Sequence, residues 1–135
     1  MSNRAKGTFE VKLTPEEEKS GDAIVGRMRI EKQFQGDIEG TSSGLMVMAG
    51  TAVQGSAGYV ALEKVTGSVH GRRGSFYLQH SGIMKRGEGQ LAIVVVPDSG
   101  TDELQGLDGM LDITITEGKH FYDFDYTLDS EFVAF

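Results

Sequence analysis

Residues 59–82 read "YVALEKVTGSVHGRRGSFYLQHSG", and this stretch decides the fold. Apolar residues recur at every second position on both sides of its centre, which is the period of a β-strand. The "GRRG" segment at 71–74 is short and carries glycines, which adopt the positive φ angles that tight hairpin turns need. Gly67 interrupts the first run and indicates a bulge or a bend. The stretch therefore predicts two antiparallel strands joined by a hairpin turn.

The same alternation extends outward along the chain in both directions. It recurs in "GTFEVKL", "AIVGRMRIEKQF", "DIEGTSSGLMVMA", "QLAIVVV", "MLDITIT" and "HFYDFDYTL". Short glycine-bearing turns separate several of these runs, at 35–37, 86–89 and 117–119. Roughly eight strands with short connections favour an antiparallel meander, and eight is about the number that closes into a barrel. We predict an all-β fold, a single antiparallel eight-stranded β-barrel, with a two-sheet sandwich as the alternative.

Composition and charge exclude several kinds of binding partner and metal site. The chain has 135 residues and a formal net charge of −7, so we expect residues 1–135 to form one acidic barrel domain. An acidic chain without a basic patch repels phosphates, which predicts no nucleic-acid partner and no anionic membrane partner. The chain has no cysteine, which excludes disulfides and thiolate metal sites. It shows no signal-like or membrane-spanning apolar run, so we expect a cytoplasmic protein.

Two connections are longer than the hairpin turns. In "TPEEEKSGD", Thr14 is a candidate N-cap with Pro15 at the first helical position, which predicts one helical turn. In "PDSGTDELQGLDG", Thr101 is a candidate cap for a turn through Leu104, which Gly106 would end. We expect at most a few helical turns in the whole chain.

Four stretches carry a family resemblance, and they span about residues 7 to 128. They are "IEKQFQGDIEGTSSG", "AGTAVQGSAGYVALEKVTGSVHGRRGSFYLQHSG", "VVPDSGTDELQGLDG" and "GKHFYDFDYTL". They resemble a bacterial family known only as a domain of unknown function, whose members are similar to the allene oxide cyclase barrel of plant cyclases and dirigent proteins. The resemblance implies the eight-stranded barrel and, by analogy, a dimer or trimer. It implies no activity, because a shared fold is not a shared function.

His80 is the best single candidate for a site. It shares a strand face with Phe76 and Leu78, which predicts that it points into the barrel. There it would orient a ligand or move a proton, or it would be a buried histidine hydrogen-bonded to a neighbour. Glu39 lies among small residues in "GDIEGTSSG" and is a second candidate, with a solvent-facing role as the alternative. If the two side chains met, they would form an acid–base dyad.

Aromatic residues supply the remaining candidates. Tyr122, Phe124 and Tyr126 share one face of "FYDFDYTL", which predicts core packing or the lining of an apolar pocket. Tyr59 falls on the strand face opposite Val60 and Leu62. Tyr77 falls on the face opposite Phe76 and Leu78. We therefore expect both tyrosines on the outer wall of the barrel, where they would join a subunit interface.

The sequence predicts no cofactor and no metal site. The acidic residues of "PDSGTDELQGLD" do not follow the spacing of a calcium loop, so we interpret them as turn and cap residues. The three histidines, at 70, 80 and 120, would have to converge from separate strands to hold a transition metal. Phosphate-binding and nucleophile-elbow motifs are missing from the sequence.

Three functions fit these observations. The leading hypothesis is a module that binds a small, largely apolar molecule in the barrel. The first alternative is an isomerase or cyclase that acts on an apolar substrate there, using His80 and Glu39. The second is a non-catalytic assembly protein with a filled barrel. The runs "LMVMA" and "AIVVV" are apolar on both faces, so we also predict a homo-oligomer.

Overall fold

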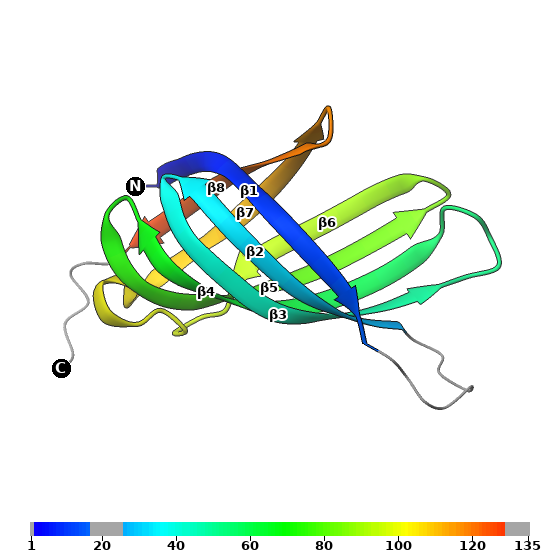
Figure 1. Ribbon diagram of the computed structural model, residues 1–135, viewed down its shortest axis with the longest axis horizontal. Helices are drawn as coiled ribbons and strands as arrows, with labels where there is room; N and C mark the ends of the chain where they lie inside the picture. The colour runs from blue at the N-terminus through cyan, green and yellow to red at the C-terminus, as the bar shows by residue number, and fades with distance from the viewer. Residues whose placement is uncertain (1, 17–25, 129–135) are drawn as a thin grey trace.

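Eight antiparallel strands close into a barrel in which each strand pairs with its neighbours in sequence and β8 returns to β1 (Figure 1). The computed structural model describes residues 2–16 and 26–128. The strands are β1 (Asn3–Pro15), β2 (Gly26–Gly36), β3 (Ile38–Gly50), β4 (Ala57–Val69), β5 (Arg72–Lys85), β6 (Glu88–Val95), β7 (Leu107–Thr116) and β8 (Lys119–Leu128). The prediction of an all-β, eight-stranded antiparallel barrel is confirmed.

Tight turns join β4 to β5, β5 to β6 and β7 to β8. In each, a non-glycine residue and the glycine after it both have positive φ, as at His70 (47°) and Gly71 (80°). Positive φ at both central residues gives a turn whose twist matches that of the flanking strands. The turn expected at 71–74 is therefore centred on His70 and Gly71, two positions earlier. Gly67 does not interrupt the ladder, because its pairing with Gly40 and with Gly74 is continuous.

The two longer connections gave different outcomes. Residues Asp102–Leu104 form one 3₁₀ turn (η1), as predicted, but the Thr101 hydroxyl contacts Ser75 in place of capping it. Thr14 and Pro15 pair with β2 at the end of β1, so the expected start of a helical turn there is wrong. An extended, paired backbone leaves neither residue free to begin a helix. Residues 17–25 of that prediction lie outside the described part of the chain.

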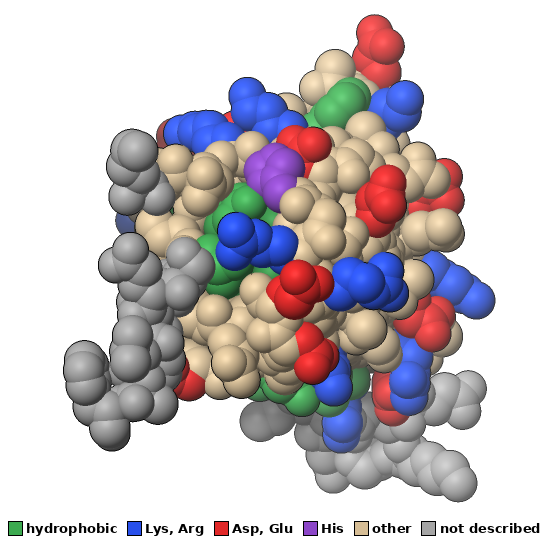
Figure 2. Space-filling model, turned by 90° about the vertical axis from the view of Figure 1, so that its left-hand side faces the viewer, with side chains coloured by type: hydrophobic (Ala, Val, Ile, Leu, Met, Phe, Trp, Pro, Cys, Tyr) green, Lys and Arg blue, Asp and Glu red, His purple; other side chains and the backbone are tan. Residues whose placement is uncertain are grey.

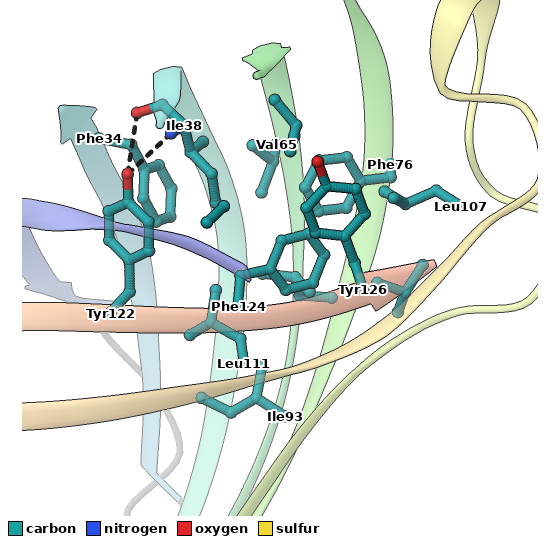
Figure 3. Packing of buried hydrophobic residues seen from close by; sticks show 14 of the residues in the cluster. Phe34, Ile38, Val65, Phe76, Ile93, Leu107, Leu111, Tyr122, Phe124 and Tyr126 are labelled. Carbon is teal, nitrogen blue, oxygen red and sulfur yellow. Dashed lines mark hydrogen bonds between the residues drawn. The ribbon is translucent and has the colours of Figure 1, made fainter. Parts of the chain in front are cut away.

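The main hydrophobic core fills one half of the barrel. Figure 3 shows large side chains from most of the strands meeting there, with Phe76, Phe124 and Tyr126 stacked in series. Tyr122 joins this core, and its hydroxyl accepts a hydrogen bond from the Ile38 N–H (2.8 Å). A second, smaller cluster consists of Ile30, Met46 and Ala61. The two clusters mark two halves of the interior that differ in packing.

The two ends of the barrel are built differently. The end that Figure 2 faces carries positive and negative side chains around a histidine, with small apolar patches between them. At the opposite end, which we call the mouth, the β5–β6 hairpin diverges from the β7–β8 hairpin (Figure 1). Within the described residues, β6 and β7 pair at one position, Val94 with Met110. The wall therefore opens toward the mouth, beyond the smaller cluster.

Candidate functional site

A cluster of polar side chains lies inside the barrel between its two apolar clusters. Four consecutive strands, β2 to β5, each contribute one buried residue: Lys32, Ser42, Glu63 and His80. Along β4, Glu63 lies between Ala61 of the smaller cluster and Val65 of the main core. Polar groups are rarely buried unless they are paired, so each member of the cluster needs a partner.

Glu63 is the centre of this polar cluster. Its Oε1 accepts hydrogen bonds from Lys32 Nζ (2.8 Å) and from His80 Nε2 (2.6 Å), and its Oε2 accepts one from Ser42 Oγ (2.5 Å). The Lys32 ammonium also lies 4.9 Å from the centroid of the Phe9 ring, a cation–π distance. Both carboxylate oxygens are thus satisfied without water.

The same contacts keep Glu63 ionised. Burial, the largest influence, raises the pKa of this carboxyl, but the hydrogen bond from His80, the charge and hydrogen bond of Lys32, and the Ser42 hydroxyl together lower it to about 2. Hydrogen bonds and a nearby positive charge favour the charged form of a carboxyl, whereas burial alone would neutralise it. Glu63 and Lys32 form a buried ion pair at neutral pH.

Strand register brings these residues together. Lys32 lies directly opposite Ser42, whereas Glu63 lies opposite Gly44 and is offset by one inward position. A Cβ at Gly44 would overlap the backbone and Cβ of Glu63, so the glycine allows the close approach of the two strands. His80 lies opposite Ala61, again one inward position from Glu63. The diagonal offsets place the long side chains within reach of one another.

Tyr59 connects the polar cluster to the mouth. Its Oη lies 3.5 Å from Nδ1 of His80, the ring nitrogen that does not contact Glu63. A Cβ at Gly82 would clash with the Tyr59 ring, so this glycine lets the ring lie across β5. Burial, and secondarily the charge of Glu63, raises the pKa of the Tyr59 phenol, which keeps it protonated at neutral pH.

An apolar pocket of about 450 Å³ adjoins Tyr59 at the mouth. Met48, Tyr59, Gly82 and Leu91 form one transverse row across β3 to β6, and they line the pocket together with Met84. Met84 and Leu91 are each 47% exposed, so solvent reaches this part of the inner face. The volume lies in the range of small-molecule sites, which are typically concave and mostly apolar with a few polar groups.

The two polar residues predicted for the site lie on opposite sides of the barrel wall. His80 faces the interior beside Phe76 and Leu78, as predicted, and is 4% exposed. Glu39 is exposed on β3, and the carboxylate that contacts His80 is Glu63. A Glu39–His80 dyad is therefore wrong, because an outward-facing side chain does not reach the interior.

The predicted aromatic residues lie deep in the barrel. Tyr122, Phe124 and Tyr126 are all buried in the main core (Figure 3), and none lines the pocket at the mouth. Tyr77 is exposed on the outer wall, as expected. Tyr59 is not on the outer wall: it alternates with the exposed residues of its strand, which are Val60, Leu62, Lys64 and Thr66. Both faces of this strand carry apolar residues, so the alternation did not reveal which face is buried.

Sequence reasoning did not identify Lys32, Ser42 or Glu63. A clue was present, because Lys32 alternates in phase with Ile30 and Phe34, which placed a charge on an apolar face. Glu63 alternates in phase with Ala61 and Val65 in the same way. Two opposite charges on inward faces indicate a buried ion pair, since an unpaired charge there is too costly.

The three histidines lie apart. His70, at the turn before β5, contacts the Tyr126 hydroxyl and lies 3.5 Å from Asp37 Oδ2, whereas the ring of His120 packs against Phe9. Across residues 2–16 and 26–128, no three His, Asp or Glu side chains are grouped so that they could hold a metal ion. In the same residues, no helix is long and apolar enough to cross a membrane.

Comparisons with known proteins identify relatives but no activity. Residues 5–126 match the model of a family described as "Protein of unknown function (DUF3224)". The crystal structure of a DUF3224 protein of unknown function from Shewanella oneidensis MR-1 is similar, with 48% sequence identity and a TM-score of 0.89. The similarity covers 96% of this chain and 98% of that one. No curated protein matches the sequence.

Proposed function

Because the chain belongs to the DUF3224 family of proteins of unknown function, we propose its function from the site alone: it binds a small, largely apolar molecule at the mouth of the barrel. The observation that carries this proposal is the apolar pocket lined by Tyr59, a residue whose hydroxyl lies 3.5 Å from His80 Nδ1. A larger hollow of about 670 Å³ lies against β1, β2 and the β7–β8 turn, but polar and charged side chains line much of it.

Binding fits the geometry better than catalysis or a completely filled barrel. The main core packs one half of the interior, which leaves the mouth as the space for a ligand. His80 is buried and is not among the residues that line the pocket at the mouth, so a substrate there would not touch the imidazole directly. We also propose that the barrel is of the allene oxide cyclase type, which the consecutive pairing of all eight strands supports. Superposition on an allene oxide cyclase tests that relation.

Leu91→Glu is expected to weaken binding of the uncharged dye N-phenyl-1-naphthylamine by about tenfold, because a carboxylate would enter the apolar pocket. Leu91 is half exposed, so the variant is expected to fold. Dye fluorescence titration measures the effect, and Val53→Glu, in the β3–β4 loop, is the matched control. Equal dye affinity in wild type and Leu91→Glu would place the dye elsewhere and contradict the proposal.

We propose in addition that the protein self-associates through one uncharged side of its wall. Two adjacent outward-facing rows carry no charge. One crosses β3 to β7 and the other crosses β3 to β6: Leu45, Leu62, Gln79, Val94 and Met110 in the first row, and Val47, Val60, Ser81 and Ala92 in the second. Outward positions of β1 and β2, such as Lys12, Arg29 and Glu31, are charged instead. Two acidic copies approach with least repulsion through their uncharged sides, and apolar surface of this extent favours burial.

Sedimentation velocity at high micromolar concentration tests this second proposal. Wild type is expected to be a dimer or trimer, and Leu62→Lys is expected to be mostly monomeric, because the charge would be buried at the centre of the interface. Lys12→Glu, on the charged side, is the control and is expected to leave the association unchanged. A monomeric wild type would refute the proposal.

A further inference from the structure

The polar cluster sets the direction of the hydrogen bonds that link Glu63, His80 and Tyr59. Glu63 is ionised, so both of its oxygens accept hydrogen bonds and neither donates. His80 Nε2 lies 2.6 Å from Glu63 Oε1 and therefore carries the proton of that bond. The carboxylate thus fixes the tautomer of the imidazole, as second partners of histidines commonly do.

The charge balance of the cluster determines the other ring nitrogen. Lys32 already supplies the one positive charge that balances Glu63, so a neutral His80 leaves the buried cluster without net charge. In a neutral imidazole whose Nε2 is protonated, Nδ1 is an acceptor. The Tyr59 hydroxyl is the donor that faces it, at 3.5 Å. The single proton of Tyr59 is therefore directed toward His80 and away from the pocket.

From this chain of donors we infer that Tyr59 presents only an acceptor to the pocket, so that the site selects apolar molecules bearing a hydroxyl donor, such as a phenol or an alcohol, over molecules that only accept. The inference rests on the proposed function, because it assigns a ligand class to the same pocket. Tyr59 is the polar side chain on the inner-face part of the lining. Gln90 also borders the pocket but pairs with Ile83 on the outward-facing side of the wall.

The series of hydrogen bonds from Tyr59 through His80 to Glu63 strengthens the preference for ligands that donate a hydrogen bond. A ligand hydroxyl would donate to Tyr59 Oη, which donates to His80 Nδ1, while His80 Nε2 donates to the Glu63 carboxylate. Hydrogen bonds that run in one direction toward an anion polarise one another, so the first acceptor is a better acceptor than an isolated phenol. An ether or ketone at the same place would bring its oxygen against a lone pair of Tyr59 Oη. Neither oxygen carries a proton for the other, so both acceptors would stay without a hydrogen bond.

Two probes of the same shape separate this inference from the proposed function. We expect wild type to bind 2-naphthol about tenfold more tightly than 2-methoxynaphthalene in calorimetric titration, although the methyl ether is the more apolar of the two. If both probes bind with equal affinity, the pocket binds apolar molecules and the donor selectivity is refuted. If neither probe binds, the proposed function and the inference that rests on it are both refuted.

Two variants test whether Tyr59 and His80 carry the selectivity. In His80→Gln, the amide nitrogen takes the place of Nε2 and can still donate to Glu63, but no acceptor remains at Nδ1. The Tyr59 proton is then free to enter the pocket, so the preference for 2-naphthol is expected to fall to twofold or less, with 2-methoxynaphthalene bound more tightly than by wild type. Tyr59→Phe leaves the Glu63–His80 contact in place and is expected to lose the preference as well. A tenfold preference that survives in Tyr59→Phe would overturn the inference, even if His80→Gln fails to fold.

Discussion

Glu63→Gln is expected to lower the free energy of unfolding by about 3–5 kcal/mol, because it leaves the Lys32 ammonium buried without a compensating charge. Glutamine keeps the shape of glutamate, so packing changes little and the effect reports the lost charge. Lys32 and Glu63 are 7% and 1% exposed, and water therefore cannot replace the missing partner. Urea unfolding followed by circular dichroism measures the difference.

The control for this prediction is Glu39→Gln, which removes a carboxylate on the exposed face of the neighbouring strand. Its effect is expected to stay within about 0.5 kcal/mol, as for most surface substitutions. The double variant Lys32→Met/Glu63→Gln is expected to lose less stability than Glu63→Gln alone, since no unpaired charge remains. A loss below about 1 kcal/mol for Glu63→Gln would mean that the ion pair is not buried as described.

Stability is expected to decrease steeply with acid between about pH 4.5 and pH 2. The pKa of Glu63 is lowered from its ordinary 4.5 to about 2 in the folded protein. A carboxyl with a lowered folded pKa stabilises the fold fully above its unfolded pKa, and that stabilisation is lost as the pH falls through the folded pKa. The shift corresponds to about 3 kcal/mol at neutral pH.

Unfolding free energies measured at intervals from pH 7 to pH 2 test this expectation. Between the two pKa values, the ionisation of Glu63 is expected to make the free energy of unfolding rise by about 1.4 kcal/mol per pH unit. The Glu63→Gln variant lacks this contribution. Above about pH 5.5 the difference between wild type and the variant is expected to be constant. Parallel curves for the two proteins across the acid range would contradict an ionised Glu63 in the core.

Much of the fold could be predicted from the sequence because its signals are local. Alternation along "SFYLQHSG" is enough to place His80 on the face of Phe76 and Leu78, and the structure confirms this face. Glycine-bearing tight turns leave no room for crossover connections, which makes neighbouring strands antiparallel. The β4–β5 turn lies two residues earlier than predicted, because its first positive φ is at His70, a residue type that gives no turn signal in the sequence.

The candidate site was predicted less well. The sequence indicated an inward-facing histidine but not its carboxylate partner, because the small residues around Glu39 do not show which face of that strand is buried. The alternation Tyr59–Ala61–Glu63 runs beside the equally apolar Val60–Leu62 series, so periodicity alone allowed either face to be buried. A one-residue difference in phase exchanges every inward and outward side chain of a strand.

The sequence by itself determined the number of strands, their antiparallel order, the presence of tight turns between them and the inward direction of His80, because each follows from a pattern of residues close along the chain. Only the tertiary structure decided which face of β4 is buried and that Lys32, Ser42 and Glu63 meet His80. These residues lie on four different strands, and Lys32 and Glu63 are 31 positions apart. Their contacts depend on the register between strands, which closure of the whole barrel sets and no local pattern encodes.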